Sequence, residues 1–350
     1  MTARSALLTV DALISAGLAP ADQAADLDRV AKAFRIRLSP AMQAAIGDAR
    51  GADDPVARQF VPRPEELTIR PEELSDPIGD HSFSPVPGLT HRYPDRVILH
   101  ATQTCEVYCR FCFRREAVGE DGTLPDAQME AALAYVAATP AIREVILTGG
   151  DPLVLSARRL GQIMARLAAI DHVDCVRLHS RVPVVAPQRI TPALLAALGQ
   201  HPSTWVVVHT NHVNELTAPA CAALARLVGA GIPLLSQSVL LKGVNDTPDA
   251  LEALFRALLR NRVKPYYLHH CDLARGTSHF RTTLAEGQAL MAALRGRLSG
   301  TCLPTYVLDI PGGHGKVPVG PAYVAETGAS GRYRVTDWQG RTHDYADPGA

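Results

Sequence analysis

The sequence has no net charge, no long hydrophobic run and no even set of cysteines. Its 350 residues include 35 Lys and Arg against 35 Asp and Glu. This balance excludes the broad positive charge that drives sequence-independent nucleic-acid binding, and no basic, aromatic-rich extension replaces it. No apolar stretch reaches the ~18 residues that a transmembrane helix needs. The apolar stretch at residues 6–19 is interrupted by Asp11 and lacks a cleavage site, which favours a helix over a signal peptide. Neither nucleic acid nor a membrane is therefore expected as a partner.

Seven cysteines without an export signal predict a reducing compartment, the cytoplasm, and cysteines with a chemical role. Apolar residues make up 47% of the chain, which excludes disorder as the dominant state. The length suits two domains or one large α/β barrel with extensions.

Short apolar or β-branched runs alternate with Ala- and Leu-rich helical patterns from Arg96 onward, about 30 residues apart after the first run. Such a repeat predicts parallel strands joined by right-handed crossovers. Six units predict an α/β fold with an incomplete (βα)6 barrel, because a full eight-stranded barrel needs about 250 residues. We expect a helical, proline-punctuated N-terminal region at 1–95, the barrel at 96–300 and a C-terminal segment at 301–350. The runs begin near Val97, Val145, Cys175, Thr204, Pro233 and Lys264, and a last one covers 306–310.

Three cysteines, Cys105, Cys109 and Cys112, follow the first of these runs at C-x3-C-x2-C spacing. Thiolates are soft ligands that suit zinc or an iron–sulfur cluster. A structural zinc site would need a fourth protein ligand, and no further cysteine or histidine has ligand spacing. The motif therefore favours a cluster that leaves one iron open for a small molecule, with a zinc knuckle or a coincidental cysteine-rich loop as the alternatives.

The residues around these cysteines resemble the lysine 2,3-aminomutase family of radical S-adenosylmethionine (SAM) enzymes, including its branch that modifies elongation factor P. The matching stretches occur in consistent order between about residues 50 and 320. They are SPVPGLTHRYPDRV (84–97), CRFCFRR (109–115), ILTGGDPL (146–153), PQRITP (187–192), CDLARGTSHFRT (271–282) and DIPGGHGKVPV (309–319).

The resemblance implies three cofactors: a [4Fe–4S] cluster on the three cysteines, SAM, and pyridoxal 5′-phosphate (PLP). Lys316, in a glycine-rich loop that lets the backbone approach a ligand, matches the lysine that forms a Schiff base with PLP. Without the resemblance, the glycines could be ordinary turns and the polar residues a solvated loop or satisfied core groups. The positions that match the family near SAM are Gly149, Gly150, Asp151, His209 and Gln237, and those on the phosphate side of PLP are Arg92, Tyr93 and Arg96.

The substrate residues implied by the resemblance are charged. Arg114 matches the residue that pairs with the substrate carboxylate, and Asp272 and Asp309 match the carboxylates that receive the distant ammonium of lysine. The implied reaction is an isomerisation that moves the 2-amino group of L-lysine to carbon 3 through a PLP aldimine and a 5′-deoxyadenosyl radical. Implied partners are the amino-acid substrate, an electron donor of the flavodoxin or ferredoxin type, and further copies of the chain in a homo-oligomer.

Three departures from the family pattern are visible. No cysteine follows Cys302, and Thr247 stands where the free-lysine enzymes have an upstream zinc ligand, so no structural zinc is predicted. His269 stands where those enzymes usually have tyrosine. The CFRR and PYYLH motifs resemble the elongation factor P branch, whereas the Asp-x-Pro-Gly-Gly form of the PLP loop resembles the free-lysine branch.

The alternatives are therefore the same reaction serving elongation factor P, an aminomutase for ornithine or glutamate, and a non-catalytic zinc-binding or regulatory protein on the same barrel. A role in nucleic-acid modification is disfavoured by the zero net charge. Glutamate is disfavoured because two carboxylates would repel its side chain.

Overall fold

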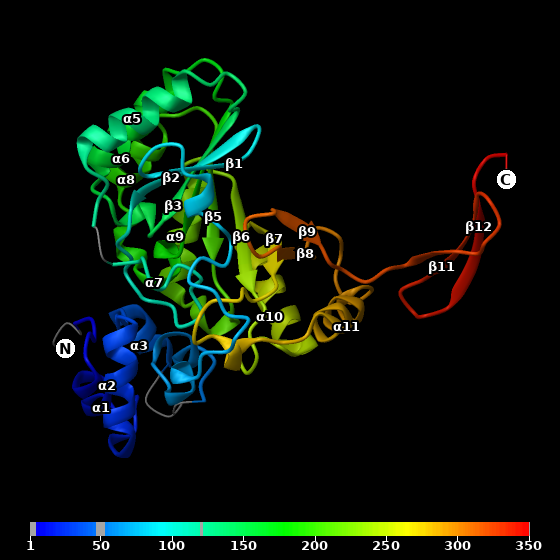
Figure 1. Cartoon of the computed structure of the whole chain (residues 1–350), viewed down its shortest axis with the longest axis horizontal. Coiled ribbons are helices and arrows are strands. Elements are labelled where there is room, and N and C mark those ends of the chain that lie inside the picture. Colours follow the sequence, from blue (N-terminus) through cyan, green and yellow to red (C-terminus); the bar gives the residue numbers. More distant parts are fainter. Residues whose placement is uncertain (1–4, 47–52, 120–121, 350) are drawn as a thin grey trace.

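The computed structural model describes residues 5–46, 53–119 and 122–349. Its main feature is a curled nine-stranded sheet in which the strands lie side by side in chain order (Figure 1). Seven of the strands are parallel, and the first and last strands pair antiparallel at the two edges. The strands are β1 (Leu89–Tyr93), β2 (Arg96–Thr102), β3 (Glu144–Gly149), β4 (Cys175–Ser180), β5 (Thr204–His209), β6 (Leu234–Val239), β7 (Val263–His269), β8 (Thr305–Asp309) and β9 (Lys316–Pro318).

Helices between the parallel strands cover the outer face of the sheet, so that its inner face encloses a cavity (Figure 1). This arrangement is the predicted partial barrel of six βα units, and β8 adds a seventh parallel strand beside β7. The connecting helices are α5 (Asp126–Ala137), α6 (Ala157–Ala168), α7 (Val182–Val185), α8 (Pro192–Leu198), α9 (Ala218–Gly229), α10 (Pro248–Arg260) and α11 (Leu284–Leu294).

Local sequence sets where these helices begin. Ser156, Thr191, Thr217, Thr247 and Thr283 each precede a helix, and each side chain accepts a hydrogen bond from a backbone N–H three residues later. Such caps satisfy the N–H groups that a first helical turn leaves unpaired. Thr247, at the position of the family's zinc-ligand cysteine, thus caps α10.

The N-terminal region lies along one end of the barrel and contributes small helices (Figure 1). They are α1 (Val10–Ser15), α2 (Ala24–Ala33), α3 (Pro40–Ile46) and α4 (Ala57–Phe60). Short 3₁₀ turns occur in this region at Ala21–Gln23, Pro64–Leu67 and His81–Phe83. Others lie in the barrel, at Pro152–Val154, Pro187–Arg189, Val213–Glu215 and Ser278–Phe280. A buried ion pair ties the N-terminal region to the cysteine loop, because Glu66 accepts hydrogen bonds from Arg110 and Arg115.

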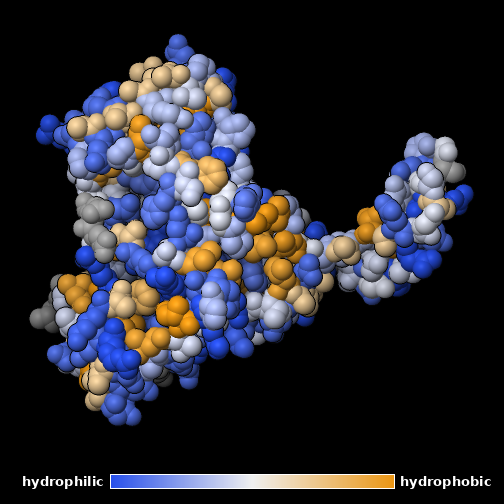
Figure 2. Space-filling view, in the orientation of Figure 1, coloured by the Kyte–Doolittle hydropathy of each residue, from blue (hydrophilic) through white to orange (hydrophobic). Residues whose placement is uncertain are grey.

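The chain ends in an arm that projects from the barrel (Figure 1). It is a three-stranded antiparallel sheet of β10 (Val324–Glu326), β11 (Arg332–Thr336) and β12 (Thr342–Ala346). Figure 2 shows apolar side chains gathered over β8 and β9 and near the start of the arm, where Val317 and Val324 are exposed. None of the helices in the described residues is long and apolar enough to cross a membrane.

The sequence does not predict β1, because HRYPDR was expected to lie just before the first strand, with Arg92, Tyr93 and Arg96 on the phosphate side of PLP. It also did not predict the arm. The boundaries expected at residues 95 and 300 stay predictions, and the sheet extends across both, since β1 and β8–β9 hydrogen bond to the strands between them.

Candidate active site

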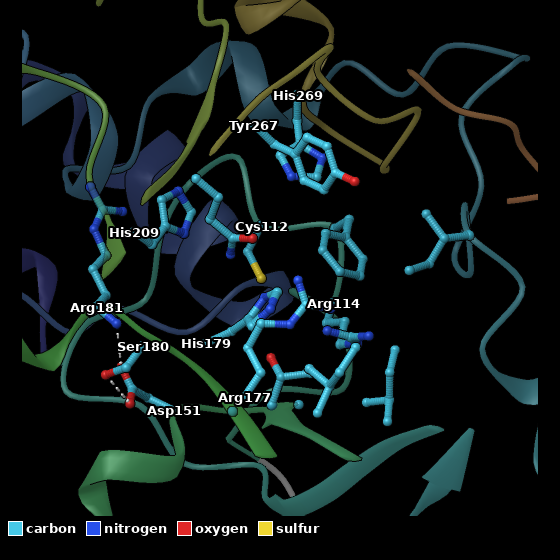
Figure 3. Close-up of a pocket in the computed structure, with 18 of the residues that line it drawn as sticks. Cys112, Arg114, Asp151, Arg177, His179, Ser180, Arg181, His209, Tyr267 and His269 are labelled. Atoms are coloured by element: carbon cyan, nitrogen blue, oxygen red, sulfur yellow. Dashed lines mark hydrogen bonds between the residues drawn. The ribbon is translucent and has the colours of Figure 1, made fainter. Parts of the chain in front are cut away.

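A cavity of about 670 Å³ lies inside the curved sheet and extends from the first residues of β2, β3 and β4 to the carboxyl ends of the parallel strands. In Figure 3, the side chains of Cys112, His179 and Arg114 point into the same space. All the site residues proposed from the sequence line this cavity, although they come from nearly the whole length of the barrel. They are Arg92, Tyr93, Arg96, Cys105, Cys109, Cys112, Arg114, Gly149, Gly150, Asp151, His209, Gln237, Asp272, Asp309 and Lys316.

The cysteine loop follows β2 and is held by the N-terminal region. The backbone N–H of Arg110 donates to the Gln59 carbonyl at 2.8 Å. Burial is the main cause that raises the pKa of all three thiols, and it raises the pKa of Cys112 to about 11. Cys109 also raises the pKa of both other thiols, and Cys112 raises that of Cys105. Buried thiols of this kind become thiolates only beside a strong positive charge such as iron.

The donor set does not fit a single metal ion, since no group of three His, Cys, Asp or Glu in the described part of the chain converges tightly enough to hold one. Three thiols on one loop facing a cavity fit an iron–sulfur cluster, whose sulfur ligands are spread around a larger core.

The turn after β3 packs directly on the start of the cysteine loop. Gly150 donates its N–H to the Thr102 carbonyl at 2.7 Å, and a Cβ at Gly150 would lie 2.5 Å from the Thr104 carbonyl oxygen. Gly149 has a φ of 106°, a conformation that other residues rarely adopt. The two glycines are therefore required by close packing of the turn on the loop.

Asp151 uses its carboxylate on the protein itself. It accepts hydrogen bonds from Ser180 Oγ (2.7 Å) and from the backbone N–H groups of Arg181 (2.7 Å), Val182 (3.0 Å) and Leu153 (3.0 Å) (Figure 3). The carboxylate thus fixes the end of β4 against the glycine turn, and the turn can offer a cofactor its backbone.

His209 and Gln237 lie opposite each other on β5 and β6. The Nε2 atom of His209 is buried without a hydrogen-bond partner. Burial holds the pKa of His209 well below its usual value, so the imidazole is neutral. A neutral ring with a free nitrogen beside the cavity fits a polar group of a bound cofactor.

Lys316 begins β9, and its backbone N–H donates to the Tyr93 hydroxyl at 2.7 Å. A Cβ at the neighbouring Gly315 would lie 2.8 Å from that hydroxyl, so glycine is needed there. The Arg96 guanidinium stacks on the Tyr93 ring at 3.8 Å. The Nε of Arg92 is buried and unpartnered. A lysine whose backbone is held by Tyr93, with Arg92 and Arg96 lining the same cavity, fits the aldehyde and the phosphate of PLP.

The Lys316 ammonium contacts Asp309, with Nζ 2.8 Å from Oδ1. His269 faces the other carboxylate oxygen, with Nδ1 3.5 Å from Oδ2. Burial opposes ionisation of Asp309, but His269 and Lys316 hold its pKa well below the usual value. In contrast, burial and the nearby Asp309 raise the pKa of Asp272 to about 7. One carboxylate is therefore ionised and compensated, and the other is half protonated near neutral pH.

Arg114 pairs with a carboxylate of the protein, Asp80, at 2.7 Å. The same carboxylate pairs with Arg92 at 3.0 Å. Two arginines share one carboxylate, and this leaves one positive charge for an anion in the cavity. No sequence motif indicates Asp80, which lies in a proline-rich stretch without periodicity.

Comparison with known proteins gives two family matches. Residues 291–349 match the family described as lysine-2,3-aminomutase, and residues 99–256 match the radical SAM superfamily.

Three curated relatives cover most of the chain. The L-lysine 2,3-aminomutase of Clostridium subterminale is 43% identical over 91% of this chain and 76% of the relative. That of Acetoanaerobium sticklandii is 47% identical over 79% of this chain and 67% of the relative. The glutamate 2,3-aminomutase of Clostridioides difficile is 36% identical over 90% of this chain and 74% of the relative.

The chain belongs to the lysine 2,3-aminomutase family. Its fold is accordingly the partial barrel of the radical SAM superfamily, as expected from the sequence. The family is a family of isomerases, and its cofactors are a [4Fe–4S] cluster, SAM and PLP. Each of the three groups of residues described above fits one of them.

Strand β4 adds residues that the resemblance did not indicate. Arg177 and His179 alternate with buried residues and face the cavity, and Arg181 follows at the strand end. The Nε2 of His179 is buried and unpartnered. The sequence could have indicated Arg177 and His179, because the alternation of apolar and polar residues along CVRLHS puts both on one face of the sheet.

Proposed function

We propose that this protein is a radical SAM L-lysine 2,3-aminomutase, which converts L-lysine to β-lysine by moving the 2-amino group to carbon 3. The observation that carries this proposal is the contact between the Lys316 ammonium and Asp309 beside a second carboxylate, Asp272. Asp309 already receives one primary alkyl ammonium, which is the group that distinguishes lysine from most other amino acids. Pairing is needed because an unpaired ammonium in a cavity is costly.

The cofactor assignments follow the fits described above. Cys105, Cys109 and Cys112 would hold the cluster, and Lys316 would anchor PLP. When bound, the reduced cluster and SAM supply a 5′-deoxyadenosyl radical, and PLP supplies a conjugated ring that stabilises an unpaired electron.

The protein's own residues hold and orient the reactants. Tyr93 fixes the backbone of Lys316 through its hydroxyl, and Arg92 and Arg96 supply positive charge on the phosphate side. Arg114 would bind the substrate carboxylate. Asp80 neutralises only one of the two arginines that it contacts, Arg92 and Arg114, so one positive charge remains for this anion. Holding both ends of lysine sets its β-carbon at one place, and the enclosing sheet limits the access of water.

The remaining assignments also belong to this proposal. We infer an N-terminal region at 1–95, a barrel at 96–300 and a C-terminal segment at 301–350. We expect an electron donor of the flavodoxin or ferredoxin type and a homo-oligomer. A cytoplasmic location agrees with the free state of all seven cysteines, each of which lies in the described residues.

An anaerobic assay tests the function. The protein is reconstituted with iron, sulfide and PLP, supplied with SAM, dithionite and L-lysine, and analysed for β-lysine by mass spectrometry. Many turnovers of β-lysine per chain support the proposal, and Lys316→Ala serves as the inactive control. A protein that cleaves SAM but leaves L-lysine unchanged overturns the substrate, and parallel reactions with L-ornithine and L-glutamate then identify a replacement.

A further inference from the structure

Arg181 is a buried arginine that contacts a cysteine of the cluster loop. It directly follows β4, and its Nη1 donates to Cys109 Sγ at 2.8 Å. Its guanidinium lies 4.5 Å from the centre of the Phe60 ring and 5.5 Å from that of Phe111. Only 6% of the side chain is exposed, so solvent screens its charge weakly.

The position of this guanidinium is set by groups other than the cysteine. Nη2 donates to Glu215 Oε2 at 2.7 Å and to Gln59 Oε1 at 2.5 Å. Gln59 in turn donates to the other oxygen of Glu215 at 2.9 Å. The backbone N–H of Arg181 is held by Asp151 at 2.7 Å. Asp151, Gln59 and Glu215 therefore hold Arg181 independently of its contact with Cys109.

A contribution to stability does not by itself explain the buried ion pair between Arg181 and Glu215. A fully buried ion pair gains little over apolar residues of the same volume, because both ions lose their hydration. The pair is also oriented, since Glu215 contacts Nη2 while Nη1 faces the sulfur. The positive end of the pair is thus the end nearer to the cysteine loop.

We infer that Arg181 sets the reduction potential of the cluster that the three cysteines would hold. The inference rests on the proposed function, which assigns a cluster to these thiols. One-electron reduction takes the cluster from the 2+ to the 1+ state, with the electron supplied by a low-potential reductant and no bond formed or broken. The added negative charge is stabilised by the nearby guanidinium and by its N–H···S hydrogen bond, and both effects raise the potential. Arg181 acts through Cys109 and is a positioning residue.

The test is a redox titration followed by electron paramagnetic resonance of the reconstituted protein, without SAM or lysine. The main variant is Arg181→Met combined with Glu215→Gln, which removes both buried charges together and leaves neither unpaired. A second charge-free variant, Arg181→Gln with Glu215→Gln, keeps a polar side chain beside Gln59. Arg181→Lys retains the charge. The matched control is Arg226→Met, which removes a partly buried arginine bonded to the carbonyls of Ile190 and Pro187.

Each charge-free variant is expected to show at least a tenfold lower ratio of reduced to oxidised cluster at a fixed ambient potential. For one electron this equals a midpoint about 59 mV lower. Arg181→Lys is expected to fall less, and Arg226→Met to match the wild type. Iron and sulfide contents are measured on every sample so that cluster loss is not mistaken for a shift.

The outcomes separate this inference from the proposed function. A charge-free variant with normal iron and sulfide and the wild-type midpoint overturns the role of Arg181. A wild type that takes up no cluster overturns both. Charge-free variants that show the expected shift, together with a wild type that makes no β-lysine, support the role of Arg181 and overturn the substrate assignment.

Discussion

Replacing Asp272 with asparagine removes the titrating carboxylate of the pair that would receive the lysine ammonium. The pKa of Asp272 is raised to about 7, whereas that of Asp309 is held low by its partners. Asp272 is then about nine-tenths protonated at pH 6 and about nine-tenths ionised at pH 8. The lysine ammonium stays charged throughout, because its usual pKa is about 10.4. The wild-type kcat/KM for lysine is therefore expected to rise about tenfold between these pH values.

The Asp272→Asn enzyme loses both the attraction and its pH dependence. Removing one partner of a desolvated charge pair costs about 3 kcal/mol, so kcat/KM for lysine at pH 8 should fall about 150-fold. The assay measures initial rates of β-amino acid formation at low substrate between pH 6 and 8. Norleucine, which has the length of lysine but no terminal ammonium, serves as the control substrate, and its rate should change little.

Stability provides a check on the same variant. A carboxyl whose pKa is about 7 in the folded protein and near 3.8 when unfolded makes the fold less stable as pH rises between these values. Asparagine removes this loss, which amounts to about 4 kcal/mol above pH 7. The variant should thus melt at a higher temperature than the wild type at pH 8. Unchanged lysine kinetics, or a tenfold pH rise that persists in Asp272→Asn, would refute the reasoning.

Three further predictions concern the cofactors and the buried charges. Cys109→Ala should lose cluster iron and SAM cleavage, measured as 5′-deoxyadenosine; equal cleavage in wild type and variant contradicts the cluster assignment. Lys316→Ala should bind no PLP covalently, seen as a missing imine absorbance band and no trapping by borohydride, while its reduced cluster still cleaves SAM. Glu66→Gln leaves Arg110 and Arg115 buried with a weakened partner, and about 3–5 kcal/mol of stability should be lost in urea unfolding; a variant within 1 kcal/mol of the wild type would count against this.

The parallel part of the fold was predictable because each strand and helix carries its own local signal. Apolar runs of strand length recur at a constant spacing, and the helices that follow start at Ser or Thr caps. The edge strand β1 carries no such signal, since its LTHRY sequence is polar and is held by pairing with β2. The strands of the arm contain no buried residue and lack an apolar face that periodicity could detect.

The candidate site was predictable where a motif names the chemistry, as for the cysteines and Lys316. Pairings between distant charges were not predictable, because nothing in sequence spacing indicates which arginine meets which carboxylate. Asp80 meets Arg114 across 34 residues, and Arg181 meets Glu215 across another 34. The role expected for Asp151 shows the same limit, since its carboxylate is occupied by protein donors that only the fold brings together.

The order of the strands also determines the order in which the site can be built during synthesis. Because neighbours in the sheet are neighbours in the chain, the cysteine loop after β2 is translated roughly 200 residues before Lys316 begins β9, an interval of ~10–40 s on a ribosome. Gln59, which holds the cysteine loop from the N-terminal side, is translated earlier still. Arg92, Tyr93 and Arg96 of the phosphate side emerge before the cysteine loop, whereas the lysine that would bind PLP does not yet exist when that loop has been translated. Covalent attachment of PLP at Lys316 can therefore begin only after the cysteine loop has been translated, and this lysine is among the last parts of the cavity to emerge.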